Sequence, residues 1–554
     1  MMSADEPDEN RAAPVPAFAP KAPADMARLS PPRAGYLTAA LLTLWIIVLH
    51  GLYLFRAGPL WRDEAGTVDF AAMPTLGDIW HNLRYDNFPP LFVAVARVWT
   101  LAGLDSDLSY RALGFLVGMG TLAALWWCAR KLGGQAPLLG LALYAANPVA
   151  IRVGDAVRPY GLGVALLLPA SALIWGFAQN PGKRTLVWAA LAAVLSVQCL
   201  YQNAVFVMAF SCAAWVVLAG RREWKTAWQT GIIGLAAALS LLPYCGVIRQ
   251  SMEWGDIARR EIHFDSILGA LGGALQAPGG GMAAVWAGLL AAALGAAVHC
   301  GIRQRQQAMV YCGAVLLAGP ALYLVFLWAV QLPPRSWYFL VLLAPAALML
   351  DAILGGMESR RWQLGRAALS LILVLGCGRA CYQSVQFRQS NIDLVAARLK
   401  ASAPPGDVIL VFPWYYGVSL QRHFDASRWS TVPPLSEVRI HRLDLVKKAM
   451  MTENPIRPLL DQMRDALRSG RRVWFVGDFP APPAGGNPGA ELPPYREGMK
   501  VTEDAYFSSW VFEITALAQK HGLKGDPVAI PVPGGQAVNP LENVSVVMVQ
   551  GWKE

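Results

Sequence analysis

The chain has 554 residues and a formal net charge of +10, with 15% charged and 55% hydrophobic residues. Soluble globular domains typically carry about 25% charged residues and a smaller apolar share. The mean hydropathy is +0.37. Together these values exclude a string of soluble domains and indicate a protein that lies largely within a membrane.

Residues 1–35 are rich in Ala, Pro and charge and lack apolar periodicity, which predicts a disordered tail. About eleven apolar stretches follow, each about long enough to cross roughly 30 Å of hydrocarbon as a helix. These predicted spans are 36–55, 111–129, 136–152, 159–178, 184–200, 203–219, 228–247, 283–300, 309–329, 337–355 and 366–382. A further apolar run, 88–104, contains Pro89, Pro90 and Arg97 and predicts a helix at the interface or a partly inserted one.

Lys and Arg gather in alternate connections between the predicted spans. The basic connections contain Arg130-Lys131, Lys183-Arg184, Arg221-Arg222, Arg303 with Arg305, and Arg360-Arg361. Basic loops stay in the cytoplasm. The N-terminal tail is therefore predicted to be cytoplasmic, and everything after residue 383 periplasmic, in a bacterial inner (plasma) membrane. The net charge then reflects topology, and no nucleic-acid partner is expected because the C-terminal region is close to charge balance.

The sequence pattern changes near residue 383, which divides the chain into three predicted parts. They are the tail 1–35, a transmembrane region 36–382 with its first outer loop at 56–110, and a periplasmic α/β domain 383–554. In the last part, predicted helices at 391–402, 458–469 and 505–521 alternate with β-prone runs at 407–412, 472–476 and 543–550. The predicted fold class is thus mainly α, polytopic, with a small C-terminal α/β domain whose sheet is mostly parallel. We expect that domain to cover or shape the membrane site.

Three acidic residues lie in the first outer loop. Asp63 and Glu64 form an adjacent pair just after the first span, and Asp86 precedes Pro89-Pro90. A carboxylate near hydrocarbon is poorly solvated, which raises its pKa and suits it to act as a base. One member of the pair could deprotonate an acceptor while the other orients it or holds a metal ion; charges at a helix terminus are the alternative. The prolines keep the preceding chain extended and could aim Asp86 toward Asp63, unless this is an ordinary turn.

Arginines also occur on the predicted outer side, where topology does not require them. They are Arg158, close to Tyr160, then Arg335, and a weaker cluster of Arg259 and Arg260. A guanidinium fork suits phosphate oxygens. Side chains that snorkel toward lipid headgroups are the alternative.

These residues together resemble the polyprenyl-phosphate-dependent glycosyltransferases of the GT-C fold, such as bacterial protein O-mannosyltransferase and lipid A aminoarabinose transferase relatives. The matching segments are Asp63-Glu64-Ala65, Asp86-Asn87-Phe88-Pro89-Pro90-Leu91, Arg111-Ala112-Leu113-Gly114, Arg158-Pro159-Tyr160 and Arg335–Pro345. The family's second motif reads Asp-x-His-Pro-Pro-Leu, so Phe88 replaces its His. The resemblance covers roughly residues 36–382 and the plan of an outer C-terminal domain.

The resemblance implies an enzyme that moves a sugar from a polyprenyl-phosphate donor to an acceptor lipid, glycan or protein on the periplasmic face. Transfer would be an inverting displacement with Asp63 as general base. The other predicted site residues are Glu64 and Asp86 for catalysis, and Arg158, Tyr160, Arg335, Arg259 and Arg260 for the donor phosphate. A divalent metal ion is a possible cofactor, although Phe88 cannot ligate it. A lipid-linked glycan ligase or polymerase and a membrane transporter are the alternative functions.

Overall fold

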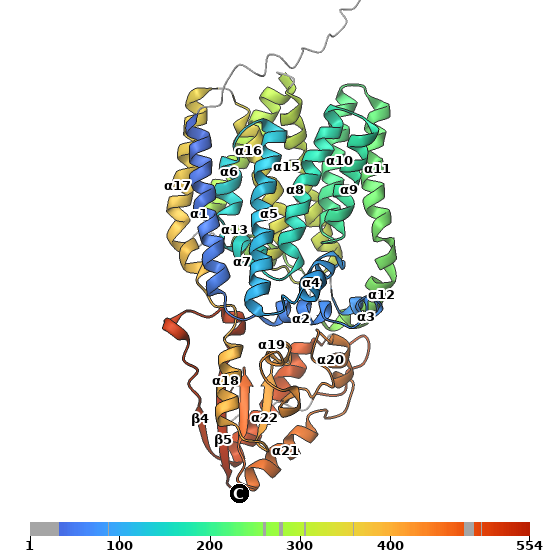
Figure 1. Ribbon diagram of the computed structural model, residues 1–554. Coiled ribbons are helices and arrows are strands. Elements are labelled where there is room, and N and C mark those ends of the chain that lie inside the picture. The colour runs from blue at the N-terminus through green and yellow to red at the C-terminus, as the bar shows by residue number, and fades with distance from the viewer. Residues whose placement is uncertain are drawn as a thin grey trace, which may run out of the picture.

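The computed structural model describes residues 33–86, 88–258, 262–275, 281–303, 306–357, 359–480, 492–499 and 501–554. Within these residues the chain forms a bundle of long helices, and a smaller α/β domain lies beyond one end of the bundle (Figure 1). Short helices of the first outer loop lie between the two parts.

Nine helical stretches of the described residues are long and apolar enough to cross a membrane. They contain α1 (Arg33–Arg56), α5 (Asp107–Gly133), α8 (Pro159–Gln179), α10 (Asn203–Gly220), α11 (Trp224–Leu241) continued by α12 (Cys245–Ala258), α14 (Gly281–Ala296), α15 (Gln307–Val330), α16 (Leu340–Gly355) and α17 (Arg360–Val385). Each corresponds to one predicted span. The protein is therefore a multi-pass membrane protein.

The predicted spans 136–152 and 184–200 take another form, so a count of eleven is not confirmed. The second is α9 (Lys183–Val197), which has 15 residues. The first is broken into α6 (Leu138–Gly140), a π-helical turn (Leu141–Ala145) and α7 (Pro148–Gly154). Asn147 makes the break, because its side chain accepts a hydrogen bond from the Val149 amide at 2.8 Å and Pro148 starts the new helix.

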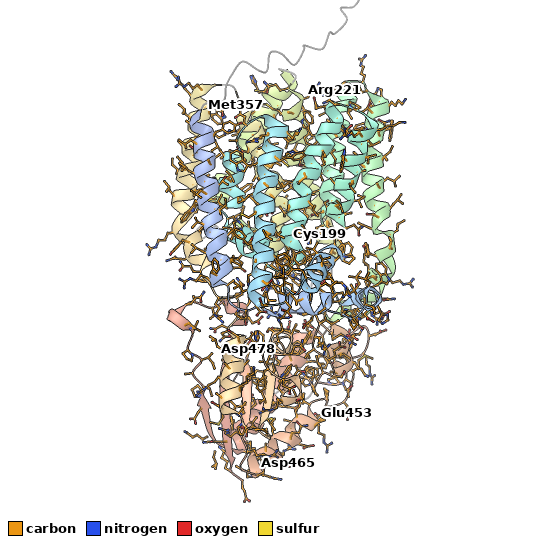
Figure 2. The ribbon with its side chains drawn as sticks, in the orientation of Figure 1. Cys199, Arg221, Met357, Glu453, Asp465 and Asp478 are labelled. Carbon is orange, nitrogen blue, oxygen red and sulfur yellow. The ribbon has the colours of Figure 1, made fainter. Side chains whose placement is uncertain are left out.

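Helix packing places α16 at the centre of the bundle. Helix α5 packs against α1 and α8, α10 against α11 and α15, and α15 against α16. Among the nine spanning stretches, that of α16 is the most buried, whereas those of α11 and α14 are the least buried. Helices α11 and α14 therefore offer their apolar surface to lipid. Figure 2 shows Arg221 and Met357 at the end of the bundle away from the C-terminal domain.

The first outer loop forms a layer of short helices against the bundle (Figure 1). Its members are α2 (Arg62–Ala71), α3 (Leu76–Asn82) and α4 (Leu91–Leu101). Helix α4 begins directly after Pro90, as the restricted backbone of the two prolines predicts. Helix α4 occupies the predicted interfacial run 88–104. Later in the chain, α13 (Phe264–Leu275) adds another short apolar helix.

The C-terminal domain contains a five-stranded sheet in the order β2-β1-β3-β5-β4. The strands are β1 (Val408–Phe412), β2 (Ser430–Thr431), β3 (Val473–Gly477), β4 (Gly522–Pro527) and β5 (Val546–Trp552). The helices are α18 (Ile392–Ser402), α19 (Tyr416–Leu420), α20 (Leu443–Met450), α21 (Arg457–Arg468) and α22 (Glu503–His521). The three predicted strands and three predicted helices are present.

The predicted mostly parallel sheet is present with one exception, because β5 runs opposite to the other four strands. Strand β1 pairs in parallel with β2 and β3, but β5 is antiparallel to both β3 and β4. Strand β4 follows α22 directly and pairs with β5, so the last strand of the chain runs back along the sheet. The short β2 and the polar β4 carried no hydrophobic pattern from which they could have been predicted.

The C-terminal domain docks on the first outer loop through a shared core. Leu60, Ala65 and Val68 of the loop belong to the same buried cluster as Trp414 and Val418 of the domain. Polar contacts surround this core. Arg422 donates to Asp107 at 2.8 Å, and Gln421 donates to Asp69 at 3.0 Å.

Candidate active site

Helix α2 carries the predicted acid pair in its first turn. Acids are favoured there because the first amides of a helix lack intrahelical partners. The Glu64 carboxylate accepts from the Trp61 amide at 3.2 Å, and Glu542 of the C-terminal domain accepts from the Arg62 amide at 2.9 Å. The terminus of α2 is thus capped from two sides, once by its own chain and once by the other domain.

Glu64 is completely buried and pairs with Arg111 of α5. The same carboxylate accepts from the Val157 amide at 2.9 Å, while Arg111 also donates to the Pro59 carbonyl at 2.7 Å. Glu64 therefore ties α2 to α5 and to the turn before α8. A carboxylate so enclosed positions its neighbours and is not reachable by a substrate.

Asp63 differs from its neighbour because 29% of its side chain is exposed. Its Oδ1 atom lies 3.6 Å from Arg62 Nε and 3.5 Å from Nε2 of His441, a residue of the C-terminal domain. Burial by surrounding protein raises the pKa of Asp63, but positive charge, first that of Arg158, outweighs it and lowers the pKa overall. The raised pKa expected from the sequence is therefore wrong for Asp63, because neighbouring cations outweigh burial. Asp63 is an ionised carboxylate that small groups can reach.

The pKa of His441 is lowered to about 4, mainly by burial; Asp63 opposes this lowering, whereas Arg158 and Arg62 add to it. His441 is consequently neutral at pH 7. At that pH the positive charges that hold down the pKa of Asp63 are therefore those of the two arginines.

Arg158 links the acids to each other. It caps the start of α8, and its Nη1 donates to Thr67 Oγ1 at 2.7 Å and to the Asp63 carbonyl at 3.2 Å. Its Nη2 lies 3.8 Å from Asp86 Oδ1. The prediction that Asp86 turns toward Asp63 thus matches the structure, with the guanidinium between them.

Aromatic rings line the bundle side of this arginine. The Arg158 guanidinium lies 4.7 Å from the centre of the Phe88 ring, which meets Tyr160 edge-on at 5.4 Å. The ring centres of Tyr160 and Tyr338 are 6.5 Å apart. Tyr338 lies in the short helical turn that directly follows Arg335. Phe88 therefore packs under the cation at the position where a histidine was expected.

Arg335 is exposed, and its guanidinium makes no hydrogen bond or ion pair with the residues that the structure describes. Its place next to Tyr338 puts it on the same side of the bundle as Arg158. The predicted Arg259 and Arg260 lie outside the described residues.

Three residues of the site were not predicted. The Arg62 guanidinium lies 4.1 Å from the ring centre of Tyr415. Arg62 could have been predicted because it directly precedes the acid pair in the sequence. Thr67 follows Asp63 by one helical turn, which was also readable once α2 was recognised. His441 stands alone in a loop, and nothing in the local sequence marks it.

A metal ion does not fit these residues. The described part of the chain holds no group of three or more His, Cys, Asp or Glu side chains arranged to bind one. Between Asp63 and Asp86 stands Arg158, which supplies the positive charge that a divalent ion would bring. We therefore derive no step through a metal.

No family model matches the sequence, and no curated protein matches it either. Solved structures do match. The apo structure of ArnT from Cupriavidus metallidurans aligns at 13% identity over 92% of this chain and 98% of that one, with a TM-score of 0.51. The same protein bound to undecaprenyl phosphate aligns at 12% identity over 92% and 97%, with a TM-score of 0.50. The oligosaccharyltransferase of Archaeoglobus fulgidus, in complex with Zn and sulfate, aligns at 11% identity over 80% and 68%, with a TM-score of 0.49.

The two ArnT alignments show that this multi-pass membrane protein has the GT-C fold, as its motifs predicted. The match to ArnT runs over nearly the full length of both chains. The C-terminal α/β domain is thus part of the shared fold.

Proposed function

We propose that this protein is a glycosyltransferase that moves a sugar from a polyprenyl-phosphate donor to an acceptor lipid, glycan or protein. The reachable carboxylate of Asp63 beside the Arg158 guanidinium supports this most directly. A base for the acceptor and a cation for the phosphate are the two groups that such a transfer needs. ArnT, whose fold the chain shares, has been solved with undecaprenyl phosphate.

Asp63 and Arg158 have separate roles in the proposed inverting displacement. The acceptor oxygen or nitrogen attacks the anomeric carbon, and the bond from that carbon to the phosphate oxygen breaks. The lipid phosphate leaves with the bonding electron pair, and the acceptor proton passes to Asp63. Arg158 binds the phosphate and stabilises its growing charge; its buried Nε makes no hydrogen bond with described residues and is available to donate.

Arg158 also couples donor binding to the strength of the base. In the free protein its charge helps hold the pKa of Asp63 low. A bound phosphate compensates that charge, so the pKa of Asp63 rises toward the range of an effective general base. The carboxylate then gains proton affinity when the donor is in place.

We further propose that the protein lies in a bacterial inner membrane with this site on the periplasmic face. Charge supports this orientation, because the basic connection at Arg221 lies at the far end of the bundle from the C-terminal domain (Figure 2). A reporter active only in the periplasm, fused after Glu554, is expected to be active. Activity of a cytoplasm-only reporter at that position contradicts the orientation.

The test of the function is transfer by Asp63→Asn protein, purified in detergent and supplied with a polyprenyl-phosphate sugar. This change keeps the size of the side chain and removes its basicity. Losing a positioned base costs about 100- to 10,000-fold in rate. Because Asp63 is 29% exposed, the variant is expected to fold like the wild type, which a thermal melt checks.

Wild-type protein and a panel of lipid, glycan and protein acceptors complete the experiment. A stable Asp63→Asn protein with near wild-type turnover contradicts the mechanism. Transfer of whole preassembled glycans instead of single sugars favours a ligase or polymerase. A wild type that moves no sugar to any acceptor, but carries a solute across proteoliposomes, favours the transporter.

A further inference from the structure

The structure brings an imidazole from the C-terminal domain against the proposed base. His441 lies in the loop before α20, and its Nε2 is 3.5 Å from Asp63 Oδ1. The two side chains are 30% and 29% exposed. That distance is longer than a good hydrogen bond, but catalytic hydrogen bonds in substrate-free sites are often long and shorten when substrate binds.

The imidazole is held between two surfaces. On one side lies Gly66 of α2, where an added Cβ atom would be 3.3 Å from Nδ1 and 3.4 Å from Cε1 of His441. On the other side, the ring of Trp414 meets the imidazole at 5.9 Å between centres and 72° between planes. A glycine one turn after Asp63 therefore lets the ring approach the helix closely enough to reach the carboxylate.

The residue after His441 anchors the loop to the segment that carries Asp86. Arg442 donates from Nε and Nη2 to Asp444, both at 2.8 Å, and its guanidinium lies 4.6 Å from the ring centre of Tyr85. The Tyr85 hydroxyl donates to Asp444 at 3.2 Å. One cluster thus holds both His441 and the residue that precedes Asp86.

The tautomer of His441 follows from its surroundings. The Nδ1 atom lies over the Gly66 backbone, whereas Nε2 faces the carboxylate of Asp63. A neutral imidazole can therefore donate a hydrogen bond to the Asp63 carboxylate only when its proton is on Nε2.

We propose that His441 is a positioning residue that donates a hydrogen bond to Asp63, fixes the direction of this base, and makes sugar transfer depend on the docked C-terminal domain. The inference rests on the proposed function. It has a consequence that a purely structural histidine would not have. A hydrogen bond to the ionised carboxylate favours that form, so its loss raises the pKa of Asp63 and moves the acid limb of the rate profile to higher pH.

The experiment compares two substitutions of the same residue. His441→Phe keeps the ring and its contact with Trp414 but has no N–H, whereas His441→Gln keeps a donor. A displacement of a catalytic group by about 1 Å can cost on the order of 100-fold in rate, so His441→Phe, which leaves Asp63 without this positioning contact, is expected to lower kcat by roughly 10- to 100-fold. Its acid limb is expected to move to higher pH while KM for the donor stays unchanged. His441→Gln is expected to restore most of both properties.

Two further variants control for folding and docking. Gly66→Ala pushes the imidazole away while both His441 and Asp63 remain, and is expected to change kcat and the acid limb in the same direction by a smaller amount. His423→Gln alters a histidine at the same interface that lies 3.6 Å from Asp107, away from Asp63. It is expected to keep the wild-type pH profile.

The outcomes separate this inference from the function itself. A wild type without transfer activity overturns the proposed function. An active wild type, an inactive Asp63→Asn, and a folded His441→Phe with unchanged kcat and acid limb overturn the role of His441 alone. If His441→Phe does not fold, Gly66→Ala takes its place in the test. An acid limb of the pH–rate profile at the wild-type position in Gly66→Ala then overturns the role of His441.

Discussion

The two ends of the helix bundle hold similar buried ion pairs but differ in what stands beside them. Next to the C-terminal domain, Arg111 pairs with Glu64, and the side chains are 1% and 0% exposed. At the far end, Arg366 of α17 pairs with Asp351 of α16 at 3.4 Å, and the side chains are 3% and 2% exposed. Among the residues that the structure describes, the first pair differs in having a partly exposed acid, Asp63, directly beside it in the chain.

The far pair serves to join helices. Asp351 accepts from the Gly140 amide of α6 at 3.3 Å, and Arg366 donates to Gln135 at 2.9 Å. Among the described residues, the contacts of this pair include no partly exposed acid that adjoins it as Asp63 adjoins Glu64. A buried ion pair by itself therefore joins helices. The pair of Arg111 and Glu64 differs because it also holds a second, partly exposed acid, Asp63, in place.

The largest expected effect comes from removing one cation from each pair. Arg111→Met and Arg366→Met each leave a buried carboxylate unpaired, which costs about 3–5 kcal/mol of stability. Thermal melts in detergent should show both losses. Folded Arg366→Met protein is expected to keep its kcat, whereas Arg111→Met is expected to lose it, because Glu64 then no longer holds the turn before Arg158 in place.

Double variants sharpen this contrast. Replacing both partners of a buried pair by apolar residues is often neutral for stability. Arg366→Met with Asp351→Leu is therefore expected to recover the melting temperature and to keep the wild-type kcat. Arg111→Met with Glu64→Leu is expected to recover the melting temperature only. Equal turnover in the two rescued proteins contradicts the distinction between the two ends.

A smaller effect is expected when the outer arginines become lysines, which keep the charge and lose the fork. Arg158 has an unused donor beside Asp63, so Arg158→Lys is expected to lower kcat/KM for the donor by roughly 10- to 100-fold. Arg335 is exposed, and Arg335→Lys is expected to lower it by less. Donor kinetics of the purified proteins measure both. Unchanged kinetics in both variants indicate that these side chains contact lipid headgroups instead.

Much of this architecture could be predicted from the sequence because a membrane restricts the length and composition of the helices that cross it. Apolar length predicted all nine spanning helices, and the two prolines predicted where α4 begins. Basic residues predicted the side of each loop, and this prediction put Asp63, Asp86 and Arg158 on one face before any contact was known.

Other features depend on contacts that no local pattern reveals. Adjacent residues of a helix project about 100° apart, so Asp63 and Glu64 could not both point in the same direction. Which of them points inward depends on α2 starting at Arg62 and on Arg111 lying opposite. His441 reaches Asp63 only through the docking of a separate domain. The antiparallel placement of β5 likewise follows from how the chain returns after α22.

The cap that Glu542 places on α2 sets an order of events during biogenesis. Its carboxylate accepts from the Arg62 amide at 2.9 Å and from the hydroxyls of Ser419 at 2.6 Å and Ser390 at 3.0 Å. Helix α2 thus depends for one of its caps on a residue that follows Arg62 by 480 positions in the chain. While the ribosome is still extending the nascent chain, the helix that bears Asp63 lacks this cap and the newly inserted bundle has no finished site.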